Sequence, residues 1–176
     1  MAGGPLEGVT IVDLTSVVVG PLCTQILADH GAEVIKVEST KGDLVRFLNG
    51  KSVTPGMGAK FLHLNRNKRS ITLDLKQPSG YTALAKLIER ADVLIWNVRP
   101  AAMARLKLAY DDVRAINAKI IYCGMFGFGQ DGRYRDKPAF DSIIQGSSGM
   151  AGLFQRAEGR PRNIPLVAAD KVVGLI

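Results

Sequence analysis

The chain has 176 residues, of which 47% are hydrophobic and 22% are charged, a balance that is typical of a soluble globular protein with a proper core. Its net charge of +7 favours anionic partners (nucleic acid, a membrane surface or a phosphorylated small molecule) without choosing among them. No apolar run has the length of a membrane span, no signal peptide is recognisable, and Cys23 and Cys123 are the only cysteines, so we expect a cytoplasmic protein without a disulfide scaffold or a zinc site.

The N-terminal part of the sequence predicts a βαβ unit. A β-branched apolar run at residues 9–12 is typical of a strand that is buried on both faces. Pro21 fits the first turn of a helix, and Gly31 stands where a helix commonly ends in a left-handed residue. A second apolar run follows at residues 34–37. Because ligands of parallel sheets bind at the carboxyl ends of the strands, the loop at residues 13–21 is the first place where we expect a site.

The rest of the chain alternates between strands and helices. We expect strands at residues 70–75, 93–96 and 120–123. We expect helices or helical turns at residues 45–48, 78–88, 101–106, 110–117, 140–150 and 170–176, an irregular excursion at 51–60, an ambiguous stretch at 61–67 and a loop at 152–165. This alternation favours an α/β fold, with a Rossmann-like open parallel sheet and helices on both faces, in one domain.

The last predicted helix is short. Residues 170–176 carry the start of an apolar helix face, but the sequence stops after one or two helical turns, before that face is complete. An alternation of strands and helices normally continues until the sheet has both of its edges. We therefore expect an N-terminal piece of a longer protein, or a second segment that supplies the rest.

Four stretches of the sequence stand out together. They are PLEGVTIVDLT with GPLCTQILADHGAEVIKVE at residues 5–38, NRNKRSITLDLK at 65–76, DVLIWNVRP at 92–100, and PAFDSIIQ with SGM at 138–150. In this order they resemble the family III coenzyme A transferases, which include formyl-, carnitine- and succinyl-CoA transferases and the related α-methylacyl-CoA racemases. Because members of that family are much longer, the resemblance implies that residues 1–176 are the N-terminal part of the CoA-binding Rossmann-like large domain, without the small domain and the C-terminal return.

The resemblance implies that Asp170 is the nucleophile. In the family, this aspartate follows a proline-containing loop and lies in a turn of small residues at the start of a helix, as in PLVAAD at residues 165–170. An ionised carboxylate attacks a thioester carbonyl without a separate base, giving a mixed anhydride and then an aspartyl-CoA thioester, which the acceptor acid opens. On local sequence alone, a helix cap is the more common role for such an aspartate.

The resemblance also implies an adenine slot and a cationic rim for coenzyme A. These contacts fall at Leu73, Lys76, Asn97, Val98, Arg99, Arg105, Lys137 and Phe140. The position of residues 97–99 at the end of a buried strand agrees with a ligand site, and Arg105 offers paired donors for a phosphate. Lys76 and Lys137 fit solvated surface charges equally well.

Three further candidate substrate-binding positions depart from the family pattern. Ser39 stands where the family has an arginine that contacts coenzyme A, Val18 stands where a glutamine lines the formyl transferase pocket, and Val19 is its neighbour. These departures weigh against a formyl substrate. The racemases have a histidine before the aspartate of the fourth stretch, whereas here Phe140 precedes Asp141, so that two-base proton exchange lacks a partner.

The first hypothesis is therefore an acyl-CoA:carboxylate CoA-transferase that forms an aspartyl-CoA thioester, with this chain carrying the CoA half-site and the nucleophile. The alternatives are an α-methylacyl-CoA racemase or isomerase, and a non-catalytic fragment that binds coenzyme A or a nucleotide. We expect acyl-CoA and a carboxylic acid as substrates, no tightly bound cofactor, no metal, and an interlocked homodimer when the protein is complete. No membrane partner is expected, and nucleic acid is the least favoured partner because no basic stretch is interleaved with aromatic residues.

Overall fold

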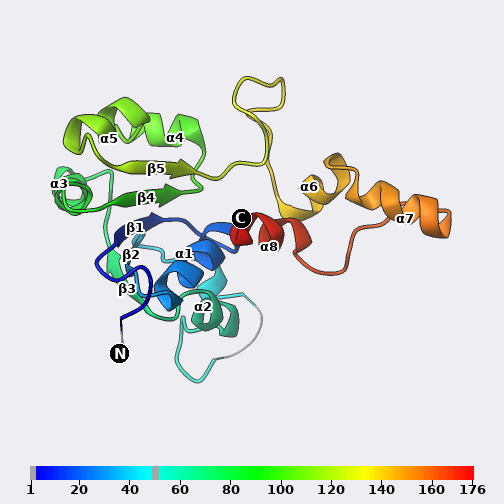
Figure 1. Ribbon diagram of the computed structural model, residues 1–176, viewed down its shortest axis with the longest axis horizontal. Coiled ribbons are helices and arrows are strands. Elements are labelled where there is room, and N and C mark those ends of the chain that lie inside the picture. Colours follow the sequence, from blue (N-terminus) through cyan, green and yellow to red (C-terminus); the bar gives the residue numbers. More distant parts are fainter. Residues whose placement is uncertain (1–2, 49–51) are drawn as a thin grey trace. The chain divides into compact units, whose positions relative to one another are not determined.

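The computed structural model describes residues 3–48 and 52–176 and consists of two compact units, Met1–Met125 and Phe126–Ile176. In Figure 1 the first unit runs from blue to green and the second from yellow to red. Among the described helices, none is both long enough and apolar enough to cross a membrane. That both units belong to one large domain of a longer protein stays a prediction.

Unit 1 (residues 1–125) is built on one parallel sheet. Within its described residues the strands are β1 (Thr10–Leu14), β2 (Glu33–Glu38), β3 (Lys68–Thr72), β4 (Val93–Trp96) and β5 (Ile121–Gly124), in the order β3-β2-β1-β4-β5. Every neighbouring pair is parallel. The chain adds strands to one side of β1 and then returns to the other side with β4, and open α/β sheets bind their ligands at such a reversal.

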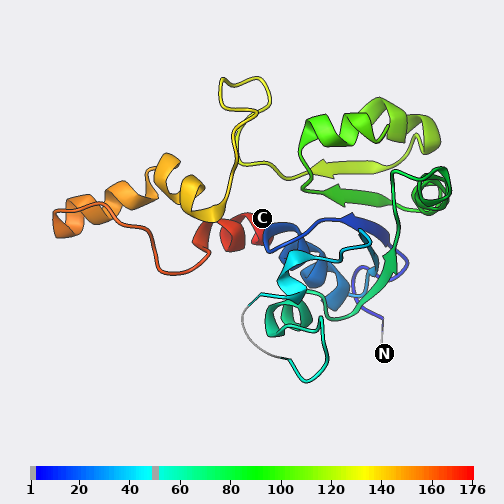
Figure 2. The same ribbon diagram turned by 180° about the vertical axis from the view of Figure 1, so that it is seen from behind.

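Helices cover both faces of this sheet, as Figures 1 and 2 show. The described helices of unit 1 are α1 (Val19–Asp29), α2 (Ala59–Leu64), α3 (Pro78–Ile88), α4 (Pro100–Arg105) and α5 (Tyr110–Ile116), with a 3-10 turn η1 (Leu44–Arg46) after β2. Of these, α2 packs against α1 and η1. Neighbouring residues of β4 point to opposite faces. Ile95 packs with Ala28 of α1, whereas Leu94 packs with Leu84 of α3 and Met103 of α4. The predicted α/β fold, a Rossmann-like parallel sheet with helices on both faces, is confirmed.

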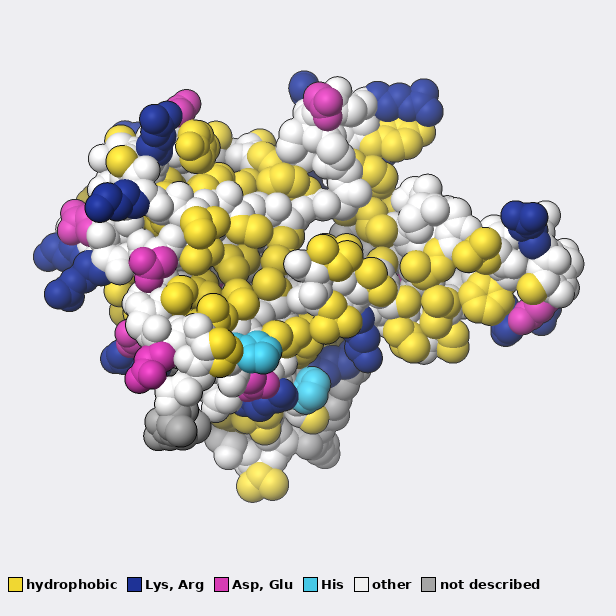
Figure 3. All heavy atoms as spheres, in the orientation of Figure 1, with side chains coloured by type: hydrophobic (Ala, Val, Ile, Leu, Met, Phe, Trp, Pro, Cys, Tyr) yellow, Lys and Arg dark blue, Asp and Glu magenta, His cyan; other side chains and the backbone are white. Residues whose placement is uncertain are grey.

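Unit 2 (residues 126–176) contains three helices in its described residues, α6 (Asp141–Ser147), α7 (Met150–Glu158) and α8 (Ala168–Leu175). α6 packs against both α7 and α8. Gln145 of α6, which is 1% exposed, donates to the Leu166 carbonyl at 2.9 Å and accepts from the Ile164 N–H at 2.8 Å, so it fixes the segment that leads into α8. α7 buries no residue, and Figure 3 shows apolar side chains on the surface of this unit.

Two differences from the sequence expectations concern the middle of the chain. The strand expected at residues 70–75 is β3, which ends at Thr72 because a turn begins at Asp74, whose carbonyl accepts from the Gln77 N–H at 3.0 Å. Helix α2 spans the junction of the stretches expected to be irregular and ambiguous. Lys51, the first residue of the expected excursion, lies outside the described residues.

The helix expected at residues 140–150 is confirmed only for residues 141–147, and the loop expected at 152–165 only for residues 159–165. Gly149 has φ +86°, in the left-handed region, so the helix breaks after Ser147. The chain then resumes as α7, and residues 152–158 are helical. Gly159, with φ +79°, is the left-handed residue that ends α7. The glycines of this stretch break and cap helices rather than form a long loop.

Replacing Leu84 by alanine is expected to destabilise unit 1 by about 3 kcal/mol, because this leucine is 0% exposed and its removal leaves a cavity. Leu62→Ala in α2 is the matched control: Leu62 is 48% exposed, and its loss should cost less than about 1 kcal/mol. Urea unfolding followed by the fluorescence of Trp96, the only tryptophan of the chain, measures both. Equal losses of stability in the two variants would contradict the packing of α3.

Candidate functional site

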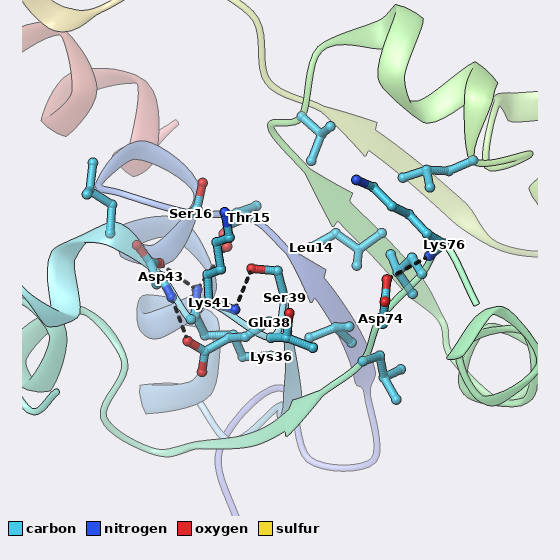
Figure 4. A pocket seen from close by; sticks show the side chains of 18 of the residues that line it. Leu14, Thr15, Ser16, Lys36, Glu38, Ser39, Lys41, Asp43, Asp74 and Lys76 are labelled. Atoms are coloured by element: carbon cyan, nitrogen blue, oxygen red, sulfur yellow. Dashed lines mark hydrogen bonds and ion pairs between the residues drawn. The ribbon is translucent and has the colours of Figure 1, made fainter. Parts of the chain in front are cut away.

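A pocket of about 640 Å³ lies in unit 1 at the carboxyl ends of β1 to β4 (Figure 4). Its walls come from the segment after β1, the end of β2 with the loop that follows, the segment after β3, and the region from the end of β4 into α4. From the loop expected at residues 13–21, Leu14, Thr15 and Ser16 line the pocket. The pocket therefore lies at the edge of the sheet where the sequence led us to expect a site.

Four of the predicted substrate-binding residues line this pocket: Ser39, Leu73, Lys76 and Val98. Leu73 and Val98 pack against the core and give the wall apolar surface. In Figure 4 the Lys76 side chain extends from the segment after β3 toward the pocket. The Ser39 hydroxyl accepts from the Lys41 N–H at 3.3 Å and so shapes its own loop. The combination of apolar surface and a cation suits a ligand with an apolar ring and negative charge.

Five other predicted residues of unit 1 are not among the residues that line the pocket, and three of these, Val18, Val19 and Asn97, precede α4 and its N-cap. Val18 is buried, with 7% exposure, and Val19 is the half-buried first residue of α1. Asn97 links the segments that follow β1 and β4, because its side chain accepts from the Ser16 N–H at 2.9 Å and donates to the Ser16 carbonyl at 2.8 Å. Asn97 thereby joins the two segments at the reversal of the strand order.

The remaining predicted binding residues are exposed or belong to unit 2. Arg99 and Arg105 lie at the two ends of α4, and both are exposed. Lys137 is in unit 2, with its ammonium 4.6 Å from the centroid of the Tyr134 ring. Phe140 precedes α6 and is 71% exposed. A role for these four residues in binding stays a prediction.

A buried ion pair supports the pocket wall. The Lys36 ammonium lies 3.0 Å from the Asp43 carboxylate, and both side chains are 1% exposed. Lys36 also donates to the Thr15 carbonyl at 2.8 Å, and Asp43 accepts from the Val17 and Val45 N–H groups at 3.2 and 3.1 Å. Sequence reasoning missed this pair, although a lysine among the apolar residues at 34–37 is a recognisable signal of a buried charge.

Glu38, the last residue of β2, accepts hydrogen bonds from three residues. Arg46 donates two at 2.7 and 2.5 Å, the Ser70 hydroxyl donates one at 2.6 Å, and the Asp43 N–H donates one at 2.9 Å. Burial alone would raise the pKa of Glu38, but the hydrogen bonds from Arg46 and Ser70 outweigh it and lower the pKa to about 2. The loop after β2 is therefore held by fixed charges at both of its ends.

A third buried carboxylate, Asp13 of β1, ties β1 to α1 and β3. It accepts from the hydroxyls of Thr15 and Thr24 at 2.5 and 2.7 Å and lies 3.2 Å from the Lys68 ammonium. Burial would raise the pKa of Asp13, but the charges of Lys68 and Lys36 outweigh it and lower the pKa. Burial lowers the pKa of Lys68 to about 8, since the nearby Asp13 charge only partly opposes it.

In unit 2, Asp170 lies in the first turn of α8 and is half-buried. Its N–H donates to the Asp141 carboxylate at 3.1 Å, whereas the Asp170 carboxylate accepts no hydrogen bond from the described residues. Burial raises the pKa of Asp170, and the nearby Asp141 charge raises it further. The N-cap position belongs to Val167, so Asp170 is not the helix cap that its local sequence also allowed.

Comparisons with known proteins cover nearly the whole chain. The model of CoA-transferase family III matches residues 6–176. A succinate–glutarate CoA-transferase from Agrobacterium fabrum is 37% identical over 181 residues, covering 97% of this chain and 44% of that protein. A formyl-CoA:oxalate CoA-transferase from Bradyrhizobium sp. is 39% identical over 176 residues, covering 97% of this chain and 40% of that protein. The chain thus spans less than half the length of these curated relatives.

A solved structure has the same fold as this chain. The crystal structure of a CAIB/BAIF family protein from Brucella suis matches with a TM-score of 0.89 at 36% identity. The match covers 96% of this chain and 45% of that one. The fold described above is therefore also found in a longer protein of known structure.

Glu38→Gln is expected to lower stability at neutral pH and to have less effect in acid. Folding lowers the pKa of Glu38 from 4.5 to about 2, so its contribution to stability is fully present above the unfolded value and is lost as the pH falls toward the folded value. The variant should differ from wild type by roughly 3 kcal/mol near neutral pH, and the difference should vanish near pH 2. Denaturant unfolding at several pH values measures it, with the exposed Glu33→Gln as control, and a difference that does not narrow in acid would refute the assignment.

Asp141→Asn is expected to lower the pKa of Asp170. Asparagine keeps an oxygen that can accept from the Asp170 N–H, but it removes the negative charge that adds to the effect of burial. Carboxyl carbon NMR titration of Asp170 measures the change. Asp136→Asn, at a side chain that is 86% exposed, serves as the control. An unchanged pKa in the Asp141 variant would mean that the two carboxylates do not interact.

Proposed function

The chain belongs to CoA-transferase family III, and on this premise we propose that the complete protein transfers coenzyme A from an acyl-CoA to a carboxylic acid. Relatives at 37% and 39% identity carry names of such transfers, succinate–glutarate and formyl-CoA:oxalate, which support the reaction class. The observation that carries the proposal is the Asp170 carboxylate, which lies in the first turn of a helix and accepts no hydrogen bond from the described residues.

We assign the coenzyme A half-site to the pocket of unit 1. The apolar surface of Leu73 and Val98 suits the adenine ring, and the Lys76 ammonium suits a phosphate. No ion pair among the described residues uses Lys76, so its charge is available to an anionic ligand. On family resemblance, we also propose contacts from the other predicted positions, Val18, Val19, Ser39, Asn97, Arg99, Arg105, Lys137 and Phe140.

Asp170 is the proposed nucleophile. One of its carboxylate oxygens attacks the thioester carbonyl, the C–S bond of the resulting tetrahedral adduct breaks, and coenzyme A leaves as a thiolate. The donor acyl group and Asp170 then form a mixed anhydride. The thiolate then attacks the aspartyl carbonyl, which releases the donor carboxylate and leaves an aspartyl-CoA thioester. The acceptor carboxylate attacks this thioester, and the thiolate released attacks the acceptor carbonyl of the new anhydride to give the new acyl-CoA and free Asp170. A raised pKa makes the ionised carboxylate a stronger nucleophile.

A racemase has less support. Phe140 occupies the position before Asp141 and carries no titratable group, so proton exchange at an α-carbon would lack one of its two bases. An interlocked homodimer and a cytoplasmic location are further proposals, and both rest on the family resemblance and on composition.

Asp170→Asn in the complete protein is expected to lower the rate of CoA transfer by about a thousandfold or more, because the amide is no nucleophile. Mass spectrometry after incubation of wild type with acyl-CoA should detect a coenzyme A adduct on Asp170 that the variant lacks. Asp131→Asn, an exposed aspartate of the same unit, is the control and should keep wild-type turnover. Undiminished transfer in the Asp170 variant would refute the proposal.

A further inference from the structure

Val17, in the segment between β1 and α1, has a backbone conformation that its side chain disfavours. Its φ is +72°, in the left-handed region, where a β-branched residue is a rare outlier. Glycine adopts this region without strain, but the sequence places a valine here. Such a conformation persists only when the surrounding structure holds it, and residues of this kind gather at functional sites.

The group that holds Val17 is the Asp43 carboxylate. Both of its oxygens accept the Val17 N–H, at 3.2 and 3.3 Å. The carboxylate is itself fixed, because it accepts from the Val45 N–H at 3.1 Å and lies 3.0 Å from the buried Lys36 ammonium. Asp43 belongs to the loop after β2, so a separate part of the chain determines the backbone at Val17.

The two residues before Val17 are also held by side chains from other parts of the chain. Lys36 of β2 donates to the Thr15 carbonyl, and Asn97 after β4 exchanges two hydrogen bonds with the backbone of Ser16. Thr15 and Ser16 line the pocket. Figure 4 shows both of them on the same side of the pocket as Lys36 and Asp43. Val17 thus directly follows Thr15 and Ser16, two residues of the pocket wall whose backbone is held by Lys36 and by Asn97.

We propose that Asp43 is a positioning residue: anchored by Lys36, it holds Val17 in the left-handed conformation and so fixes the pocket-lining segment in front of α1. The inference rests on the proposed function, since its effect is on the orientation of a bound acyl-CoA. Without this hold, the segment relaxes toward ordinary backbone angles and the pocket wall shifts. A misplacement of about 1 Å costs up to about a hundredfold in rate. The rest of the pocket still binds coenzyme A, so kcat falls more than affinity does.

The test combines Asp43→Ala with Lys36→Met in the complete protein, so that no unpaired buried charge remains. We expect kcat to fall about tenfold or more while KM for acyl-CoA changes less than about threefold. Adding Val17→Gly should recover the part of the lost kcat that Val17 causes, because glycine takes the left-handed conformation without the carboxylate. The part that comes from the lost hydrogen bond of Lys36 to the Thr15 carbonyl should remain lost. The control, Glu33→Gln with Arg69→Met, removes an exposed ion pair of 2.7 Å between β2 and β3 and should keep kcat within about twofold.

Two results would overturn the inference: wild-type kcat in the protein with both substitutions, or a lost kcat of which Val17→Gly restores no part. Hydrogen exchange at the Val17 amide is a readout that does not require catalysis, and it should become about tenfold faster or more when Asp43 and Lys36 are replaced. If the wild-type protein transfers no coenzyme A, the proposed function fails by itself. An unchanged exchange rate at Val17 then overturns the inference as well.

Discussion

The buried Lys36 ammonium is the charge on which the ligand-facing edge of the sheet depends. It has two partners, the Asp43 carboxylate at 3.0 Å and the Thr15 carbonyl at 2.8 Å, and they come from segments that follow two different strands. An unpaired ammonium in this position would cost several kcal/mol, so neither segment moves away without a large loss of stability. The segment after β1 and the loop after β2 therefore keep fixed positions around the pocket, and Glu38 and Arg46 hold the second of them from its other side.

The sequence predicts best those elements whose side chains all lie in the same apolar environment. β4 was expected at residues 93–96 and is observed at Val93–Trp96, because the strand is buried on both faces and polar residues flank it. α7 was missed because it is short and buries no side chain, although Met150, Leu153 and Phe154 recur at helical spacing. Gly149 and Gly159 are equally compatible with a loop and with helix ends, and only the backbone angles distinguish the two.

Some features of the candidate site could likewise be predicted from the sequence, and others could not. The pocket could be expected from the ends of the strands, and the family resemblance pointed to Leu73 and Val98, which line it. The contact between Asp43 and Val17 could not be predicted, because it joins residues 26 apart and depends on the register of β1 against β2. The role of Asp170 as a cap was also undecided by sequence. The local pattern allows it, but the backbone assigns the N-cap position to Val167.

The strand order has a consequence for how the protein is made. β1 is synthesised first but lies in the middle of the sheet, with β2 on one side and β4 on the other. The Thr10 N–H finds its acceptor in Asp92, 82 residues later in the chain. While the ribosome adds those residues, one edge of β1 has no neighbour, and an open strand edge of this kind readily pairs with other nascent chains. The interval between the synthesis of β1 and that of β4 is therefore a stage of biosynthesis at which the chain is open to intermolecular strand pairing.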